Sequence, residues 1–203
     1  MKELFSISYW TKRYNRNGGS GDGSRGPWLE YKANYLNEFI KNNKISNVLD
    51  FGSGDLYVAK KLEIDEYTGL DCADSSKYYD EKEPVGPKLL SLHQTRFDTF
   101  VPDKQYDLVT CLDVFYHIMD DEGEYLKAMI QTMFDSAREY IIVYSLDSES
   151  EQVKKQFETR ISHTFNSPWR EIFREHDDFE LVSTDEGKGL PGNNTYFFVF
   201  KRK

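Results

Sequence analysis

The sequence predicts an α/β domain with a mostly parallel sheet, helices on both faces and an antiparallel final strand. Short apolar runs alternate with helical segments through most of the chain, which is typical of βαβ units. Near the end, two strand-like runs are separated only by the turn-rich stretch DEGKGLPGNN, and strands joined in this way pair antiparallel. The 203 residues suffice for one well-buried core, so we expect a single domain at residues 28–203, preceded by an N-terminal arm at residues 1–27.

Each expected element has its own pattern. Pro27 suits a first helical turn, and apolar residues at helical spacing from Trp28 to Ile40 predict an amphipathic helix over residues 28–43. The other elements follow from shorter apolar or β-rich runs and from the helical segments between them. The strands are expected at residues 46–51, 67–71, 88–92, 106–112, 139–145, 179–184 and 195–201, with helices at residues 56–62 and 122–134. These seven strands predict a Rossmann-like sheet.

Composition limits the classes of partner. The net charge of −9 disfavours duplex nucleic acid or an anionic membrane, because phosphate binding depends on Lys and Arg. No run approaches the roughly 20 apolar residues that span a bilayer, so we expect a cytoplasmic protein with no membrane-inserted segment. Cys72 and Cys111 both fall in apolar runs, which is consistent with a reducing compartment.

Two glycine-rich stretches are candidates for a cofactor loop. The first glycine loop, Gly21–Gly26 (GDGSRG), matches the dinucleotide pattern GxGxxG, but a polar, basic segment precedes it instead of a strand, so a flexible linker explains it well. The second glycine loop, Gly52–Asp55, follows a strand directly and precedes a helical pattern, which is the context that cofactor loops need. Tyr57 stands where a dinucleotide fingerprint has its third glycine, and this argues against NAD or FAD.

Asp71 supports a nucleoside ligand at the second glycine loop. It ends the next expected strand, 19 residues after Gly52. A carboxylate at that point accepts hydrogen bonds from the ribose hydroxyls of an adenosine. The sequence therefore predicts a site for a nucleoside without a diphosphate.

These motifs carry a family resemblance. DFGSGD followed by GLD resembles motifs I and II of class I S-adenosylmethionine-dependent methyltransferases, and YDLVTCLDVFYHIMDD resembles their fourth-strand motif. The likeness covers about residues 28–203 and implies that fold, S-adenosylmethionine as cofactor and S-adenosylhomocysteine as product. Leu56 stands where the family pattern has a further glycine. The resemblance implies cofactor contacts from Asp50, Gly52, Ser53, Gly54, Asp55, Asp71, Cys72 and Leu112, with Asp71 at the ribose, Cys72 at the adenine and Asp50 orienting the loop or the cofactor ammonium group.

The fourth-strand motif also contains the candidates for acid–base chemistry. Methyl transfer is an in-line displacement, and a hydroxyl acceptor needs a group that takes its proton. Asp113 and His117 lie four residues apart where the strand ends, and His117 is the natural general base, although it could instead pack the turn. His163, after the fifth strand, is a second candidate base. The acidic run at residues 120–124 suits a helix cap, and we expect no metal site because no His or Cys cluster supports it.

The arm carries a narrower resemblance. YWTKRY at residues 9–14, the first glycine loop, the segment Tyr31-Lys32-Ala33 and the later ISHTFNSPW are similar to a group of class I methyltransferases from glycan-assembly pathways of bacteria and large DNA viruses. That likeness implies O-methylation of a sugar hydroxyl in a small-molecule or glycan acceptor. It also implies that the arm folds over the cofactor as a lid, with Tyr14 and Arg25 as cofactor contacts and Arg25 at the cofactor carboxylate.

Three other functions stay open from the sequence. The acceptor could be another small molecule, or RNA, along which the basic arm could lie. A nicotinamide oxidoreductase is disfavoured by Tyr57. A module that binds S-adenosylmethionine or a partner without transferring a methyl group is the non-enzymatic alternative. The oligomeric state is likewise open.

Overall fold

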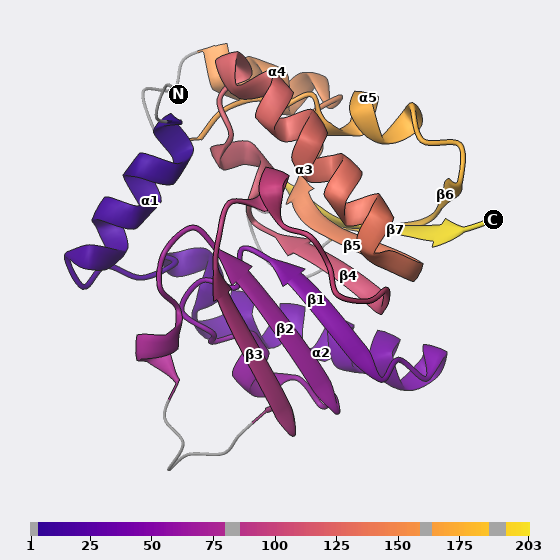
Figure 1. The fold of residues 1–203 in the computed structure, drawn as a ribbon. Helices are drawn as coiled ribbons and strands as arrows, with labels where there is room; N and C mark the ends of the chain where they lie inside the picture. Colours follow the sequence, from indigo (N-terminus) through magenta and orange to yellow (C-terminus); the bar gives the residue numbers. More distant parts are fainter. Residues whose placement is uncertain (1–3, 80–85, 159–163, 187–193) are drawn as a thin grey trace.

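A seven-stranded sheet forms the centre of the fold (Figure 1). The computed structural model describes residues 4–79, 86–158, 164–186 and 194–203. The strands are β1 (Asn47–Phe51), β2 (Glu66–Asp71), β3 (Leu89–Gln94), β4 (Tyr106–Leu112), β5 (Ala137–Leu146), β6 (Phe179–Glu186) and β7 (Thr195–Arg202), in the order β3-β2-β1-β4-β5-β7-β6. The pairs from β3 to β5 are parallel, and β7 runs antiparallel to both β5 and β6. The predicted fold class, including its antiparallel end, is confirmed.

Helices cover both faces of the sheet (Figure 1). The helices are α1 (Phe5–Asn15), α2 (Gly26–Asn43), α3 (Gly123–Ser136), α4 (Glu151–Glu158) and α5 (Trp169–Arg174). On one face, Leu36 and Ile40 of α2 pack in a cluster with β1 and β4; on the other, α3 and α5 pack against the same strands. A parallel sheet needs such cover because its strands are apolar on both sides. Among the described residues, no helix is both long enough and apolar enough to cross a bilayer.

One expected element is wrong, and the cause is local. Residues 56–62 do not form an α-helix; only the 3₁₀ turn η2 (Ala59–Lys61) forms there. Leu56 has a φ of 64° in the left-handed region, which a right-handed helix cannot include. Its side chain is nonetheless buried at 1% exposure, so core packing holds the strained backbone.

The helix α1 was not expected, since the arm was interpreted as a polar segment with a glycine-rich lid. Its Ile7, Trp10 and Tyr14 recur at spacings of three and four, which places them on one face. All three line the same cavity against the sheet. Short helices gain most of their stability from such packing, so the isolated sequence of the arm carries only a weak signal.

Candidate active site

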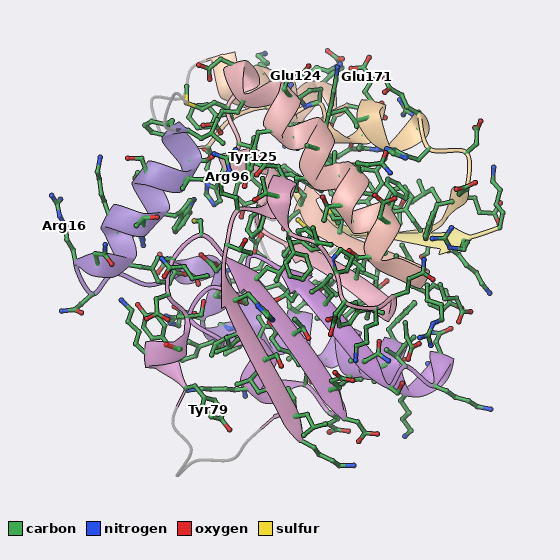
Figure 2. All side chains as sticks on the ribbon, viewed as in Figure 1. Arg16, Tyr79, Arg96, Glu124, Tyr125 and Glu171 are labelled. Carbon is green, nitrogen blue, oxygen red and sulfur yellow. The ribbon has the colours of Figure 1, made fainter. Side chains whose placement is uncertain are left out.

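A cavity of about 560 Å³ lies at the carboxyl ends of β1, β2 and β4. The strand order reverses between β1 and β4, and ligands of open parallel sheets bind at such a point. The 3₁₀ turns η1 (Asp22–Ser24) and η5 (Phe115–His117) add to its walls, and Tyr125 closes it on the α3 side, with the Arg96 guanidinium 5.5 Å from its ring (Figure 2). The predicted site residues that line it are Tyr14, Gly52, Gly54, Asp71, Cys72, Leu112, Asp113 and His117.

The second glycine loop requires glycines for two reasons: their positive φ angles and the lack of room for a Cβ atom. Gly52 has a φ of 90° and Gly54 a φ of 57°, a region that side chains disfavour. A Cβ on Gly52 would lie 2.4 Å from Val114 Cγ2, and one on Gly54 would lie 2.3 Å from Ser20 Oγ. Leu56, at the position where the family pattern has a further glycine, also has a left-handed backbone, with a φ of 64°.

Asp71 joins the end of β2 to the second glycine loop. Its carboxylate accepts hydrogen bonds from the backbone N–H groups of Gly54 and Ala73, each at 2.9 Å. Burial raises the pKa of Asp71 to about 6, although these two hydrogen bonds oppose the shift. Asp71 therefore changes charge close to neutral pH while lining the cavity.

The two glycine loops lie against each other. The Ser20 N–H donates to Asp55 Oδ2 at 2.8 Å, the Asp55 N–H donates to Ser20 Oγ at 3.2 Å, and the Tyr14 and Ser20 hydroxyls are hydrogen-bonded at 2.7 Å. Gly21 and Gly23 of the first glycine loop line the cavity. The first glycine loop is thus part of the cavity wall, even though it lacks the context of a dinucleotide fingerprint.

Arg25 and Asp55 pair with each other. The guanidinium forms an ion pair with the Asp55 carboxylate and stacks 3.7 Å from the ring centre of Tyr57. Burial alone would raise the pKa of Asp55, but hydrogen bonds from Arg25 and Ser20 hold it below its usual value. Neither residue is among those that line the cavity, whereas Arg13 of α1 is.

Asp50 and Ser53 lie behind the second glycine loop. The Asp50 carboxylate accepts hydrogen bonds from the Tyr67 and Thr110 hydroxyls, both at 2.6 Å, and burial raises its pKa. The hydroxyls of Ser53 and Ser75 lie 3.3 Å apart. Neither Asp50 nor Ser53 is among the lining residues, so the geometry favours a supporting role for both.

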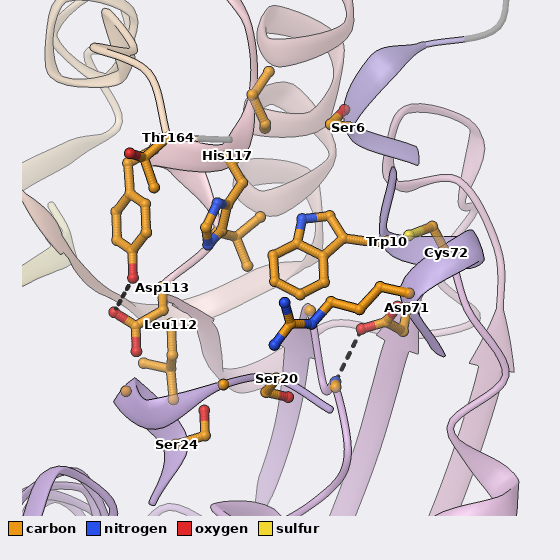
Figure 3. A pocket seen from close by; sticks show the side chains of 18 of the residues that line it. Ser6, Trp10, Ser20, Ser24, Asp71, Cys72, Leu112, Asp113, His117 and Thr164 are labelled. Carbon is orange, nitrogen blue, oxygen red and sulfur yellow. Dashed lines mark hydrogen bonds between the residues drawn. The ribbon is translucent and has the colours of Figure 1, made fainter. Parts of the chain in front are cut away.

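The turn after β4 holds the candidates for chemistry. Figure 3 shows His117 facing the Trp10 ring, and their ring centres are 4.8 Å apart. Asp113 has a φ of 60°, and its carboxylate accepts hydrogen bonds from the Tyr116 hydroxyl at 2.8 Å and from the Lys32 ammonium. His163 lies outside the described residues. Within those residues, no group of three His, Cys, Asp or Glu side chains is arranged to hold a metal ion.

Comparison with known proteins identifies the family. A family model described as a methyltransferase domain matches residues 25–182. The chain belongs to the methyltransferase domain family. It is therefore an enzyme that transfers methyl groups, and the cavity at the switch point is the candidate active site of this methyltransferase.

Solved structures share the fold. Magnesium protoporphyrin IX methyltransferase from Synechocystis, with bound SAH, has a TM-score of 0.69 at 16% identity, over 97% of this chain and 98% of that chain. The N-methyltransferase NodS from Bradyrhizobium japonicum, also with bound SAH, has a TM-score of 0.68 at 13% identity, over 97% of this chain and 98% of that chain. An S-adenosylmethionine-dependent methyltransferase from Clostridium acetobutylicum has a TM-score of 0.66 at 10% identity, over 97% of each chain. Among curated protein sequences, none matches this chain.

Several residues of the methyltransferase cavity lie in the motifs that carry the resemblances but were not predicted as site residues. Trp10, Arg13 and Tyr116 line it, and Lys32 reaches Asp113 from α2. A signal existed for Lys32, because it interrupts the buried face formed by Leu29, Ala33, Leu36 and Ile40. A lysine in such a face must have a partner elsewhere in the fold.

The first turn of α1 binds the buried carboxylate of Glu122, which lies just before α3. The Ser6 N–H and hydroxyl donate to Glu122 at 3.1 and 2.6 Å, and Glu122 is 4% exposed. The acidic run was expected to cap the helix that follows it. α3 itself has no side-chain cap bond, but Glu122 accepts a hydrogen bond from the Met119 N–H at 3.3 Å at the start of η6 (Asp120–Glu122), the 3₁₀ turn that leads into α3, and the same carboxylate also binds α1. At the other end of α1, Arg16 extends into solvent (Figure 2).

Replacing Glu122 by Gln is expected to loosen the arm of the methyltransferase. Charge-assisted hydrogen bonds to Ser6 become neutral, which costs about 1 kcal/mol. Limited proteolysis should cut within residues 1–27 faster in this variant than in the unchanged protein. The matched control is Glu124→Gln, on an exposed side chain two residues away; equal cleavage of all three proteins would contradict the docking role.

Proposed function

We propose that this methyltransferase transfers the methyl group of S-adenosylmethionine to a hydroxyl of a sugar or related small acceptor in glycan synthesis. One observation carries the proposal: a single cavity has Asp71 and Cys72 toward one side and His117 and Thr164 toward the other, with Trp10 between them (Figure 3). The first side suits the cofactor, and the second suits a polar acceptor that must lose a proton.

The residues present fit the cofactor. Gly52 and Gly54 have no Cβ, so their backbone can approach a ligand in a space that side chains would fill. The Asp71 carboxylate can accept hydrogen bonds from ribose hydroxyls. Cys72 follows Asp71 along the cavity wall, where an adenine would lie. Arg13, rather than the paired Arg25, is the cation placed to bind the cofactor carboxylate. When bound, the cofactor supplies a methyl group on a cationic sulfur that a nucleophile can displace.

Methyl transfer then needs positioning, exclusion of water and a proton acceptor. The helix α1 closes one wall through Ile7, Trp10 and Tyr14, which limits access of water. Both oxygens of Asp113 already accept hydrogen bonds, so His117 is the better base for the acceptor hydroxyl. Ser24, Tyr116, Thr164 and Thr195 also line the cavity with His117, and their hydroxyl groups suit an acceptor with several hydroxyls.

A product assay tests the proposal. The protein is incubated with S-adenosylmethionine and separate sets of saccharides, nucleotide sugars, amines and RNA, and mass spectrometry detects added methyl groups. We expect a singly methylated saccharide whose new ether linkage fragments as an O-methyl group. Methylation of amines or RNA alone would replace the sugar acceptor, and tight cofactor binding without product in any set would favour the non-catalytic alternative.

The raised pKa of Asp71 predicts how cofactor binding depends on pH. Ribose hydroxyls donate to the ionised carboxylate, so affinity for S-adenosylhomocysteine should be full above the Asp71 pKa of about 6 and decline as pH falls through it. The limiting slope is about tenfold in Kd for each pH unit below that value. Calorimetric titrations between about pH 5 and about pH 8 measure it. Asp71→Asn should bind more weakly at all pH values and lose this slope; an unchanged slope in that variant would assign the effect to another group.

A further inference from the structure

Lys32 is an unusual residue for its place in the fold. It lies on the buried face of α2, is 1% exposed, and has Leu29, Ala33 and Leu36 as buried neighbours along that face. An ammonium group that leaves water loses its hydration, so this position is costly unless a partner compensates the charge. The compensation comes from the Asp113 carboxylate, 81 residues away in the sequence, and from the ring of Tyr144, whose centre lies 5.4 Å from the Lys32 Nζ.

Asp113 is fixed in turn by several contacts. Its N–H donates to the Tyr144 carbonyl at 2.8 Å, one carboxylate oxygen accepts from Lys32, and the other accepts from the Tyr116 hydroxyl. Its φ of 60° is a conformation that non-glycine residues keep only where the surroundings hold it. The carboxylate therefore connects α2 to the turn that contains Tyr116 and His117.

The same carboxylate also meets the arm. A Cβ built on Gly23 would lie 3.5 Å from Asp113 Oδ2, so η1 of the first glycine loop packs directly over the Lys32–Asp113 pair. Tyr116 and His117 have ring centres 4.5 Å apart, and His117 contacts Trp10 of α1. Thus the pair is at the junction of α2, the arm and η5, next to Tyr116.

We infer that Lys32 is a positioning residue for methyl transfer, which acts through Asp113 to hold Tyr116 and His117 in their working orientation. This inference rests on the proposed function only in that η5 must contact the acceptor. Asp113 then serves as an anchor rather than as a base. Loss of Lys32 leaves the Asp113 carboxylate without its cation at the edge of the cavity, which weakens the anchor for the Tyr116 hydroxyl and, through the Tyr116 ring, for His117.

Four variants separate positioning from simple structural support: Lys32→Met, Lys32→Arg, Asp113→Asn and the double variant Lys32→Met/Asp113→Asn. The matched control is Lys41→Met, the same change at an exposed position of the same helix. For each protein we measure thermal unfolding, calorimetric binding of S-adenosylhomocysteine, and kcat and KM with a saccharide acceptor. Lys32→Met should lower kcat about 100-fold, keep the Kd for S-adenosylhomocysteine within about threefold and lower Tm, and Lys32→Arg should recover much of kcat.

The double variant is the decisive one. It removes both charges, so Tm should return toward that of the unchanged protein, but the anchor is still missing and kcat should stay low. If kcat recovers together with Tm, or if Lys32→Met does not lower kcat, Lys32 only supports the fold and the inference is overturned.

A second readout does not depend on an acceptor. The imidazole ¹H–¹³C NMR signal of His117, assigned by its loss in His117→Ala, should be a single sharp peak in the unchanged protein bound to S-adenosylhomocysteine. It should broaden or split in Lys32→Met and in the double variant, and stay sharp in Lys41→Met. Absence of turnover on every saccharide with this NMR pattern would count against the proposed sugar acceptor alone; an unperturbed His117 signal in the Lys32 variants would count against the positioning role.

Discussion

Replacing His117 by Ala is expected to lower kcat by about 10²- to 10⁴-fold, the range that a general base usually contributes. His117 lies in the cavity against Trp10, and the neighbouring carboxylate of Asp113 is already hydrogen-bonded on both oxygens. Removal of the imidazole leaves the acceptor hydroxyl without a group that can take its proton. Initial rates at saturating cofactor and saccharide measure the effect.

Cofactor binding separates this effect from damage to the cavity. Affinity for S-adenosylhomocysteine should stay within about threefold in His117→Ala, because the proposed cofactor contacts are Asp71 and the second glycine loop. The matched control is His93→Ala, an exposed histidine on β3. If His117→Ala turns over like the unchanged protein while it binds the cofactor, His117 only shapes the turn after β4.

Replacing Gly54 by Ala is expected to reduce cofactor affinity by about tenfold or more, since the Ser20 and Tyr14 hydroxyls must move aside to admit one methyl group. The new Cβ would lie 2.3 Å from Ser20 Oγ and 3.0 Å from the Tyr14 hydroxyl, at a φ of 57°. The left-handed backbone adds a cost of about 1 kcal/mol for alanine. The change therefore disturbs the contact of Ser20 and Tyr14 with the second glycine loop, beside the proposed cofactor site.

The control for this variant is another glycine-to-alanine change. Gly123 begins α3 with a φ of −56°, and a Cβ there meets nothing within 4 Å. Gly123→Ala should keep the cofactor affinity and stability of the unchanged protein. Calorimetry with S-adenosylhomocysteine and thermal unfolding compare the two variants, and normal binding by Gly54→Ala would show that close contact between the loops is not needed.

The sequence predicted most of the sheet, because strands and their connections follow from local patterns. The run Tyr106–Leu112 has the same bounds in the structure as expected, and the closing β6–β7 pair is antiparallel as the turn-rich connection indicated. The helix expected at residues 56–62 failed because its first residue, Leu56, is left-handed. The spacing of apolar residues does not show that one residue in the segment has a positive φ.

The sequence predicted site residues that are set by the local order of strand and loop. It did not predict contacts between residues that are far apart in the sequence. The second glycine loop and Asp71 lie at the cavity as their strand-end positions indicated. Arg25, by contrast, pairs with Asp55 at a separation of 30 residues, Lys32 with Asp113 at 81, and Ser6 with Glu122 at 116. Such pairs are formed by tertiary packing. The sequence alone can show one member of a pair as unusual, such as the lysine in the buried face of α2, but it does not identify the partner.

The most direct test of the account is calorimetric titration of the unchanged protein with S-adenosylhomocysteine and, separately, with NADH. We expect saturable binding of one S-adenosylhomocysteine per chain, severe loss of that binding in Asp71→Ala, and no binding of NADH. Binding of NADH in place of S-adenosylhomocysteine, or S-adenosylhomocysteine affinity that is unchanged by Asp71→Ala, would contradict the assignment of this cavity as the cofactor site.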